Sequence, residues 1–345
     1  MSPPAQIATA VRVADEASWG QLLRALAQTY DIWAPVAEKN RVILRCLSPD
    51  ELDQVKLDAP PTLLPAKKVY RAPEETLLRF RKGEVEPLGN GQHPWALVGI
   101  HPCDLRAIQL LDRVYTGFFA DERYSHRRQQ NFLVVANCLQ PFPHCFCTSF
   151  QSGPFARKEY DLAVTPLFGR HLVQAGSAAG EAFLRVLGLP ETTGSELAEL
   201  VAAQAQAEQA VTRKVNTDNL PRLLNMNVDH PVWDQIADRC LSCGACTAVC
   251  PTCYCFSVQD RLNLDLQSGE RRMAWTSCLI MEFSRVALGH NPRHERVARV
   301  KQRLYHKFSY FNDQYGQFGC VGCGRCVDTC VAGIDPVEVL AQLRR

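Results

Sequence analysis

The chain has 345 residues, of which 46% are apolar, and this length and composition suit one large or two medium-sized globular domains. No stretch approaches the roughly 20 apolar residues of a membrane span, and no signal peptide precedes the first predicted helix, so we expect a cytoplasmic protein. The formal net charge of +2 gives a nucleic-acid role no support.

The N-terminal part has the pattern of a mixed α/β domain. In chain order we predict a helix over 15–28, strands over 30–36 and 41–46, a loop over 59–68, a strand over 96–100, a helix over 104–115 and a strand over 132–136. Asp15 is the predicted N-cap of the first helix. Continuous apolar strands that alternate with helices indicate parallel pairing in a sheet with both faces covered.

A change of character follows. Ser195 is the predicted N-cap of a helix that runs to about Val211. The polar segment 212–228 is interrupted by Pro221, and we place the domain boundary there, which gives domains 1–220 and 221–345. The second domain has few strand signals and long helical patterns, such as the one over 296–313.

The second domain carries an internal repeat of cysteines. Both copies have the spacing C-x2-C-x2-C-x3-C, which holds [4Fe–4S] clusters in bacterial two-cluster ferredoxins. Three cysteines of one copy can wrap one cubane, and the fourth lies on the following helix and reaches the other cluster. The predicted ligands are set A (Cys240, Cys243, Cys246 and Cys330) and set B (Cys320, Cys323, Cys326 and Cys250).

A pair of zinc sites is the alternative interpretation. Zinc often takes two separated CxxC pairs per ion, so two four-cysteine runs of identical spacing favour cubanes. Gly244, Gly322 and Gly324 fit the cubane interpretation because a backbone that passes close to sulfide has no room for a Cβ. Val331 stands where the first copy has Pro251, which weakens only the helix-start signal.

About 70 residues separate the two copies and have helical patterns, so we expect an α-helical ferredoxin-type domain that holds two clusters. Segment 293–307 within this insertion is basic. It is either a solvated helix face, or a docking face or electrostatic counterweight for anionic clusters.

A second group of cysteines lies in the N-terminal domain. Cys103 follows one apolar strand and Cys138 follows the next, and parallel neighbours would bring both to one edge of the sheet. The loop after Cys138 could fold Cys145 and Cys147 back toward them. Four thiolates near a helix N-terminus could hold a third cluster, and the alternative is four buried free cysteines. We refer to these four residues as set C.

Several segments occur together in one order: HPCDLRAI, NCLQPFPHCFCTSF, RCLSCGACTAVCPTCYCF, ERRMAWTSC and CVGCGRCVDTC. Together they resemble the iron–sulfur β subunit of cytosolic NAD(P)-linked nickel–iron hydrogenases of the sulfhydrogenase type. They are similar also to an iron–sulfur subunit of anaerobic sulfite reductase. The likeness covers residues 60–335, and it implies a third [4Fe–4S] cluster on Cys103, Cys138, Cys145 and Cys147. Three clusters would take the formal charge from +2 to about −4.

Four cysteines remain outside these sets. We expect Cys46 to be a buried structural thiol. Cys253 and Cys255 follow Cys250 closely and should line a cluster pocket, and Cys278 falls in a predicted helix. These last three either tune a cluster potential or substitute for an assigned ligand.

The chain lacks the glycine-rich motifs that bind flavin, nicotinamide or nucleotide phosphates, and it shows no site that turns over a substrate. We therefore interpret it as a non-catalytic electron-transfer subunit of an oxidoreductase complex. The resemblance implies two kinds of partner: a diaphorase-type flavoprotein that binds FAD and NAD(P), and the small and large subunits of a nickel–iron hydrogenase. A sirohaem sulfite reductase or a sulfur reductase is the alternative partner, and a free-standing ferredoxin-like carrier or redox sensor is the third hypothesis.

Overall fold

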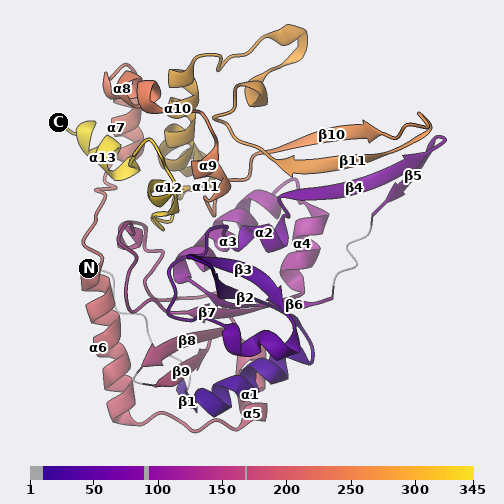
Figure 1. The fold of residues 1–345 in the computed structure, drawn as a ribbon. Helices are drawn as coiled ribbons and strands as arrows, with labels where there is room; N and C mark the ends of the chain where they lie inside the picture. Colours follow the sequence, from indigo (N-terminus) through magenta and orange to yellow (C-terminus); the bar gives the residue numbers. More distant parts are fainter. Residues whose placement is uncertain (1–10, 89–92, 168) are drawn as a thin grey trace.

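A seven-stranded sheet forms the centre of the N-terminal part of this computed structural model, which describes residues 11–88, 93–167 and 169–345 (Figure 1). The strand order is β1-β9-β8-β7-β6-β2-β3. The strands are β1 (Val11–Asp15), β2 (Asp31–Glu38), β3 (Arg41–Leu47), β6 (Trp95–Ile100), β7 (Asn131–Ala136), β8 (Leu162–Leu167) and β9 (Arg170–Ala175).

The middle of this sheet is parallel, as the apolar strand pattern predicts. Strands β2, β6, β7 and β8 pair in parallel, and the outer pairs are antiparallel. β6 is buried along its whole length, and β7 is buried apart from its first residue, because helices cover both faces. Parallel β6 and β7 end at the same edge of the sheet, and the segments after them carry Cys103 and Cys138.

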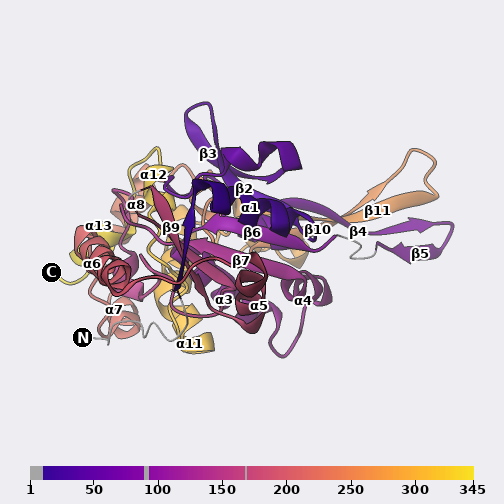
Figure 2. The same ribbon diagram turned by 90° about the horizontal axis from the view of Figure 1, so that it is seen from below.

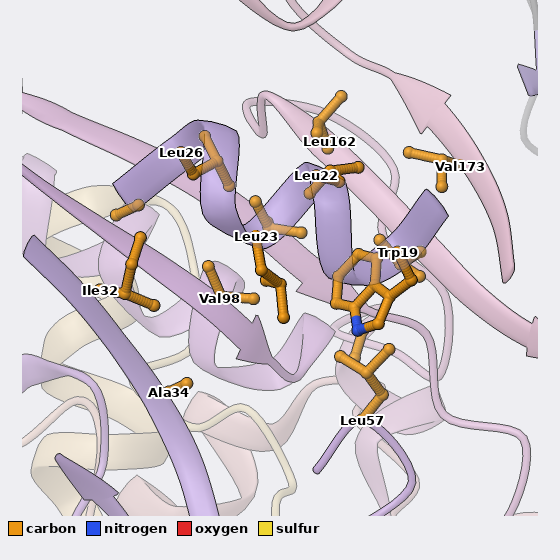
Figure 3. Packing of buried hydrophobic residues seen from close by; sticks show 14 of the residues in the cluster. Trp19, Leu22, Leu23, Leu26, Ile32, Ala34, Leu57, Val98, Leu162 and Val173 are labelled. Atoms are coloured by element: carbon orange, nitrogen blue, oxygen red, sulfur yellow. The ribbon is translucent and has the colours of Figure 1, made fainter. Parts of the chain in front are cut away.

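Helices cover the sheet on both sides. They are α1 (Glu16–Ala27), α2 (Lys67–Tyr70), α3 (Pro102–Tyr115), α4 (Glu122–Gln129) and α5 (Ala178–Leu187). The Asp15 carboxylate caps α1 as predicted, because it accepts a hydrogen bond of 2.8 Å from the Ser18 amide. Trp19, Leu22 and Leu26 of α1 pack against one face of the sheet (Figure 3). Burial of each such leucine contributes about 1.5–3 kcal/mol.

Two predictions in this part need correction. Helix α6 (Gly194–Ala210) is capped by Thr193 rather than Ser195, because Thr193 and Glu196 form a reciprocal capping box. Cys46 is exposed rather than buried. It lies on edge strand β3, and strand alternation turns it away from the side on which Leu44 and Leu47 are buried.

A second sheet joins the two predicted domains. Its order is β10-β11-β4-β5, from β4 (Glu74–Arg81), β5 (Glu84–Pro87), β10 (Phe256–Leu262) and β11 (Ser268–Trp275). Strand β11 of the C-terminal insertion pairs with β4 of the N-terminal part. The sheet projects from the body of the molecule in both views (Figures 1 and 2). The insertion is therefore not wholly helical as predicted, since it contributes this hairpin.

The rest of the C-terminal part is helical. Its helices are α7 (Leu220–Met226), α8 (Val232–Arg239), α9 (Ala245–Ala248), α10 (Arg296–Tyr305), α11 (Phe311–Tyr315), α12 (Arg325–Asp328) and α13 (Pro336–Gln342). A π-helical stretch (His306–Tyr310) joins α10 to α11, as the long helical pattern over 296–313 predicts. Short 3₁₀ helices occur at Pro49–Gln54, Cys147–Phe150, Met281–Ser284 and Ala287–Gly289. Within the described ranges, no helix is long and apolar enough to cross a membrane.

Candidate iron–sulfur centres

The two cysteine repeats have the same backbone form. Two residues after the first cysteine, Ser242 (φ 52°) and Gly322 (φ 62°) have left-handed conformations. Each of these residues donates its amide hydrogen to the preceding cysteine sulfur at 3.4 Å, Ser242 to Cys240 and Gly322 to Cys320. Short helices α9 and α12 then follow Gly244 and Gly324 and contact each other. The internal repeat seen in the sequence is thus a structural repeat.

The fourth cysteine of the second copy lies with the first copy. A cavity of about 50 Å³ is lined by all four members of set A, together with apolar residues that include Leu279 and Leu304. Cys330 also accepts a hydrogen bond of 3.4 Å from the Ile334 amide. Cys326, which we assign to set B, lies at the edge of this cavity as well, so the two sets are neighbours.

The reciprocal arrangement brings Cys250 to the second copy. Burial raises the pKa of Cys320, Cys323 and Cys326, and in all three Cys250 is among the nearby charges that act on the thiol. The chain therefore crosses between the two sites in both directions, because α9 and α12 each direct one cysteine toward the opposite copy.

Set C forms at the sheet edge that the strand pattern indicates. Burial is the first cause that raises the pKa of all four thiols, to about 12 for Cys145 and about 11 for Cys147. Neighbouring Cys147 and Cys145 add to the effect at Cys138. Four mutually repelling buried thiols ionise only if a cationic group joins them, and iron of a cluster supplies that charge.

His101 orients one member of set C. Its Nε2 donates to the Ala59 carbonyl at 3.0 Å, and its Nδ1 lies 2.8 Å from Cys138 Sγ. Burial lowers the pKa of His101. This arrangement matches the role predicted for His101 as a hydrogen-bonding neighbour of the cysteines.

The cysteine sets are more open than a mononuclear metal site. In the part of the chain that the structure describes, no three His, Cys, Asp or Glu side chains meet closely enough to hold one ion. A cubane binds each thiolate to a different iron atom, so its ligands stand further apart than those of one zinc ion. The zinc alternative thus has no supporting geometry.

Set C lies directly against set B. The Cys145 thiol is 3.6 Å from the Cys323 carbonyl oxygen, and the Phe146 amide donates to the Gly322 carbonyl at 2.8 Å. Cys103 and Cys323 share one apolar cluster. A buried ion pair of 2.6 Å between Arg325 and Asp104 joins the same two segments. The sequence places these segments in different domains, and only the folded chain makes them one site.

The glycines of the second repeat permit this contact. A Cβ on Gly322 would lie 2.6 Å from the Phe146 backbone, and one on Gly324 would lie 2.6 Å from the His144 backbone. A Cβ on Gly244 would lie 3.0 Å from Ser277 Cβ. Close approach of protein segments therefore accounts for these glycines, in addition to the approach to sulfide that the sequence suggests.

The basic segment 293–307 turns charge toward the cysteines. Arg299, Arg303 and Lys307 recur every four residues on one buried face. Burial lowers the pKa of Lys307, but the thiolates of Cys250 and Cys253 outweigh this and raise it. Buried cations here favour the counterweight interpretation over a solvated face.

Three cysteines that the sequence leaves unassigned meet beside set A. The pairing of Phe256 with Trp275 closes the base of the β10–β11 hairpin, so Cys255 and Cys278 flank that base. Their thiols share a hydrogen bond, and Cys253 forms a similar one with Cys250. The hydrogen bond from Cys278, with Lys307 and Lys67 adding to it, lowers the pKa of Cys255 to about 6. Only recognition of the hairpin could have predicted this pair.

The crossed ligand sets lead to a spectroscopic prediction. We expect Cys250→Ala and Cys326→Ala each to remove the same electron paramagnetic resonance (EPR) signal, because both remove a ligand of set B. Cys330→Ala should instead remove the signal that Cys240→Ala removes. Loss of different signals from Cys250→Ala and Cys326→Ala would contradict the crossed assignment.

Comparison with known proteins agrees with this geometry. Residues 239–334 match the 4Fe-4S dicluster domain family, which spans both repeats. The chain is 34% identical over 297 residues to sulfhydrogenase 2 subunit beta of Pyrococcus furiosus, a match that covers 86% of this chain and 87% of that protein. The chain carries [4Fe–4S] clusters in its C-terminal part, and it belongs to the family of sulfhydrogenase β subunits.

Proposed function

We propose that the chain is an electron-transfer subunit that relays electrons through three [4Fe–4S] clusters, held by sets C, B and A in that spatial order. A bound [4Fe–4S] group accepts and releases one electron at a time. The observation that carries the proposal is the contact of Cys323 and Cys326 with both neighbours. Cys323 meets Cys145 of set C, and Cys326 lines the cavity of set A.

The chain controls the charge around each set in a different way. Set A and set B receive backbone N–H groups at sulfur, which stabilise the added electron. Buried Arg303 and Lys307 lie beside them and do the same by charge. Set C has the Arg325–Asp104 pair nearby, whose charges offset each other. We therefore infer a lower potential for set C than for sets A and B.

The relay would open to a partner at set A. Cys243 is exposed, and Leu241 and Val331, which line the same cavity, are 67% and 82% exposed. Ile280 and Met281, both partly exposed apolar residues, lie on the adjoining segment. Exposed apolar residues around a redox site suit docking of another protein. The sulfhydrogenase relationship favours a nickel–iron hydrogenase module and an FAD- and NAD(P)-binding flavoprotein as the two partners.

Native purification tests this function. A tagged full-length chain, recovered under anaerobic conditions from its own host, should bring nickel and flavin with it. Recovery of sirohaem instead would replace hydrogenase with a sulfite reductase. A chain that is recovered without partners and is fully competent in electron transfer would contradict its assignment to a larger complex.

Iron content tests the number of clusters. The reconstituted chain should hold about 12 iron atoms, and Cys103→Ala should lower this to about 8 while it leaves the C-terminal pair intact. Cys46→Ala is the matched control, because Cys46 lies on the exposed edge strand β3 and should lose no iron. A firm value of about 8 in the unmodified chain would remove the third cluster from the proposal.

A further inference from the structure

The pair Cys255 and Cys278 has no place in the three ligand sets. Cys278 is buried and Cys255 is half-buried, and their thiols share a hydrogen bond. The Thr276 amide donates to the Cys255 carbonyl at 3.0 Å, which holds the two segments together at the base of the hairpin. Two thiols in this relation can form a disulfide with little movement of the backbone.

The pair lies next to set A. Ser277, which precedes Cys278, packs against Gly244 of the first repeat. Leu279, which follows Cys278, lines the cavity of set A. Cys243 of set A and Cys255 line one further cavity of about 200 Å³. An electron on set A would therefore have only a short distance to travel to the pair.

The two thiols differ in access. The cavity of about 200 Å³ is lined by Cys255, Lys67 and Trp275, among others, whereas Cys278 does not line it. Lys67 is held beside this cavity, because its Nζ donates to the Cys253 carbonyl at 2.8 Å and lies 4.1 Å from the centre of the Trp275 ring. Cys255 is thus placed to meet a molecule in the cavity, and Cys278 is placed to attack Cys255 from behind.

We propose that Cys255 and Cys278 form a redox-active dithiol that takes two electrons from the neighbouring clusters and passes them to a small disulfide bound in this cavity. The inference rests on the proposed electron-transfer function, because reduced clusters supply the electrons. Such a pair converts single-electron steps into a two-electron exchange. The lowered pKa of Cys255 agrees with its role as the attacking thiolate.

Atoms and electrons balance in this exchange. The Cys255 thiolate attacks one sulfur of the substrate disulfide, forms a mixed disulfide and releases one thiolate. The Cys278 thiol then attacks Cys255 Sγ, which forms the Cys255–Cys278 disulfide and releases the second product as a thiol. Two electrons from reduced clusters and one proton from water restore the Cys255 thiolate and the Cys278 thiol.

A reductive titration tests the proposal on the reconstituted full-length chain. The protein is oxidised anaerobically with hydroxyethyl disulfide, freed of the reagent and titrated with titanium(III) citrate. The unmodified chain and Cys46→Ser should take up two electrons more than Cys255→Ser or Cys278→Ser. Iron content and cluster EPR signals should be the same in all four. Equal electron uptake in all four would overturn the inference, and so would loss of iron in Cys255→Ser, since Cys255 would then be a cluster ligand.

Peptide mapping provides a second readout. After oxidation, alkylation and digestion, the unmodified chain should yield a peptide in which Cys255 is linked to Cys278. Cys278→Ser should trap hydroxyethyl thiol on Cys255, because the resolving thiol is gone. Trapping on Cys253 or on no cysteine would overturn the assignment. Clusters that form but cannot be reduced would count against the proposed function, whereas reducible clusters without this cross-link would count against the inference alone.

Discussion

Asp104→Ala is expected to destabilise the chain by about 3–5 kcal/mol, because it leaves the buried Arg325 guanidinium without its carboxylate. The side chains of Arg325 and Asp104 are only 4% and 3% exposed, and their atoms are 2.6 Å apart. Arg325 also donates to the Thr62 carbonyl at 2.8 Å. The free energy of unfolding, measured by denaturant titration, checks this value.

The position of this pair adds a second consequence. Asp104 follows Cys103 of set C, and Arg325 lies between Cys323 and Cys326 of set B. Loss of the pair should loosen the contact between the two sets, so we expect iron to be lost from set C first. A double variant, Asp104→Ala with Arg325→Met, should recover part of the lost stability because no buried charge remains unpaired.

The exposed pair Arg271–Asp260 on the projecting sheet is the matched control. Its side chains are 47% and 49% exposed at a distance of 2.7 Å. Asp260→Ala should cost no more than about 1 kcal/mol, because water screens an exposed pair. Equal losses for Asp104→Ala and Asp260→Ala would show that burial of the Arg325–Asp104 pair is unimportant.

Gly324→Ala is the second substitution with a large expected effect. Gly324 has a φ of 75°, and an added Cβ would lie 2.6 Å from the carbonyl carbon and oxygen of His144. The left-handed backbone costs about 1–2 kcal/mol, and the clash adds about 1–3 kcal/mol, since a backbone atom cannot move aside as a side chain can. We expect lower stability together with loss of iron from sets B and C, measured by denaturant titration and iron analysis.

Gly333→Ala separates the two causes. Gly333 also has a left-handed backbone, with a φ of 61°, but no atom lies within 4 Å of the position that a Cβ would take. This variant should show only the cost of about 1–2 kcal/mol for the backbone conformation. If Gly324→Ala behaved like Gly333→Ala, close contact with the His144 loop would not hold the two sets together.

Local chemistry made sets A and B predictable from the sequence. The spacing of Cys240 to Cys250, and of Cys320 to Cys330, is short enough that a turn and the start of a helix determine where each sulfur points. The family match over 239–334 agrees with that spacing. The parallel strands that precede Cys103 and Cys138 were equally visible, because strands buried on both faces are continuously apolar.

The hairpin of the insertion was not visible in this way. Strands β10 and β11 are largely exposed, so they lack the apolar alternation that marks a half-buried strand. Pairing with β4, which lies far away in the sequence, holds them in place. The meeting of Cys255 with Cys278 depends on that hairpin, and for this reason it could not be foreseen.

The sequence by itself determined the kind of cofactor, the C-terminal ligand spacing and the α/β character of the N-terminal part, because each of these depends on residues close together in the chain. Only the tertiary structure decided that set C lies against set B, that Arg303 and Lys307 turn inward, and that a dithiol lies beside set A. These features depend on contacts between distant segments, such as Arg325 with Asp104, which no local pattern records.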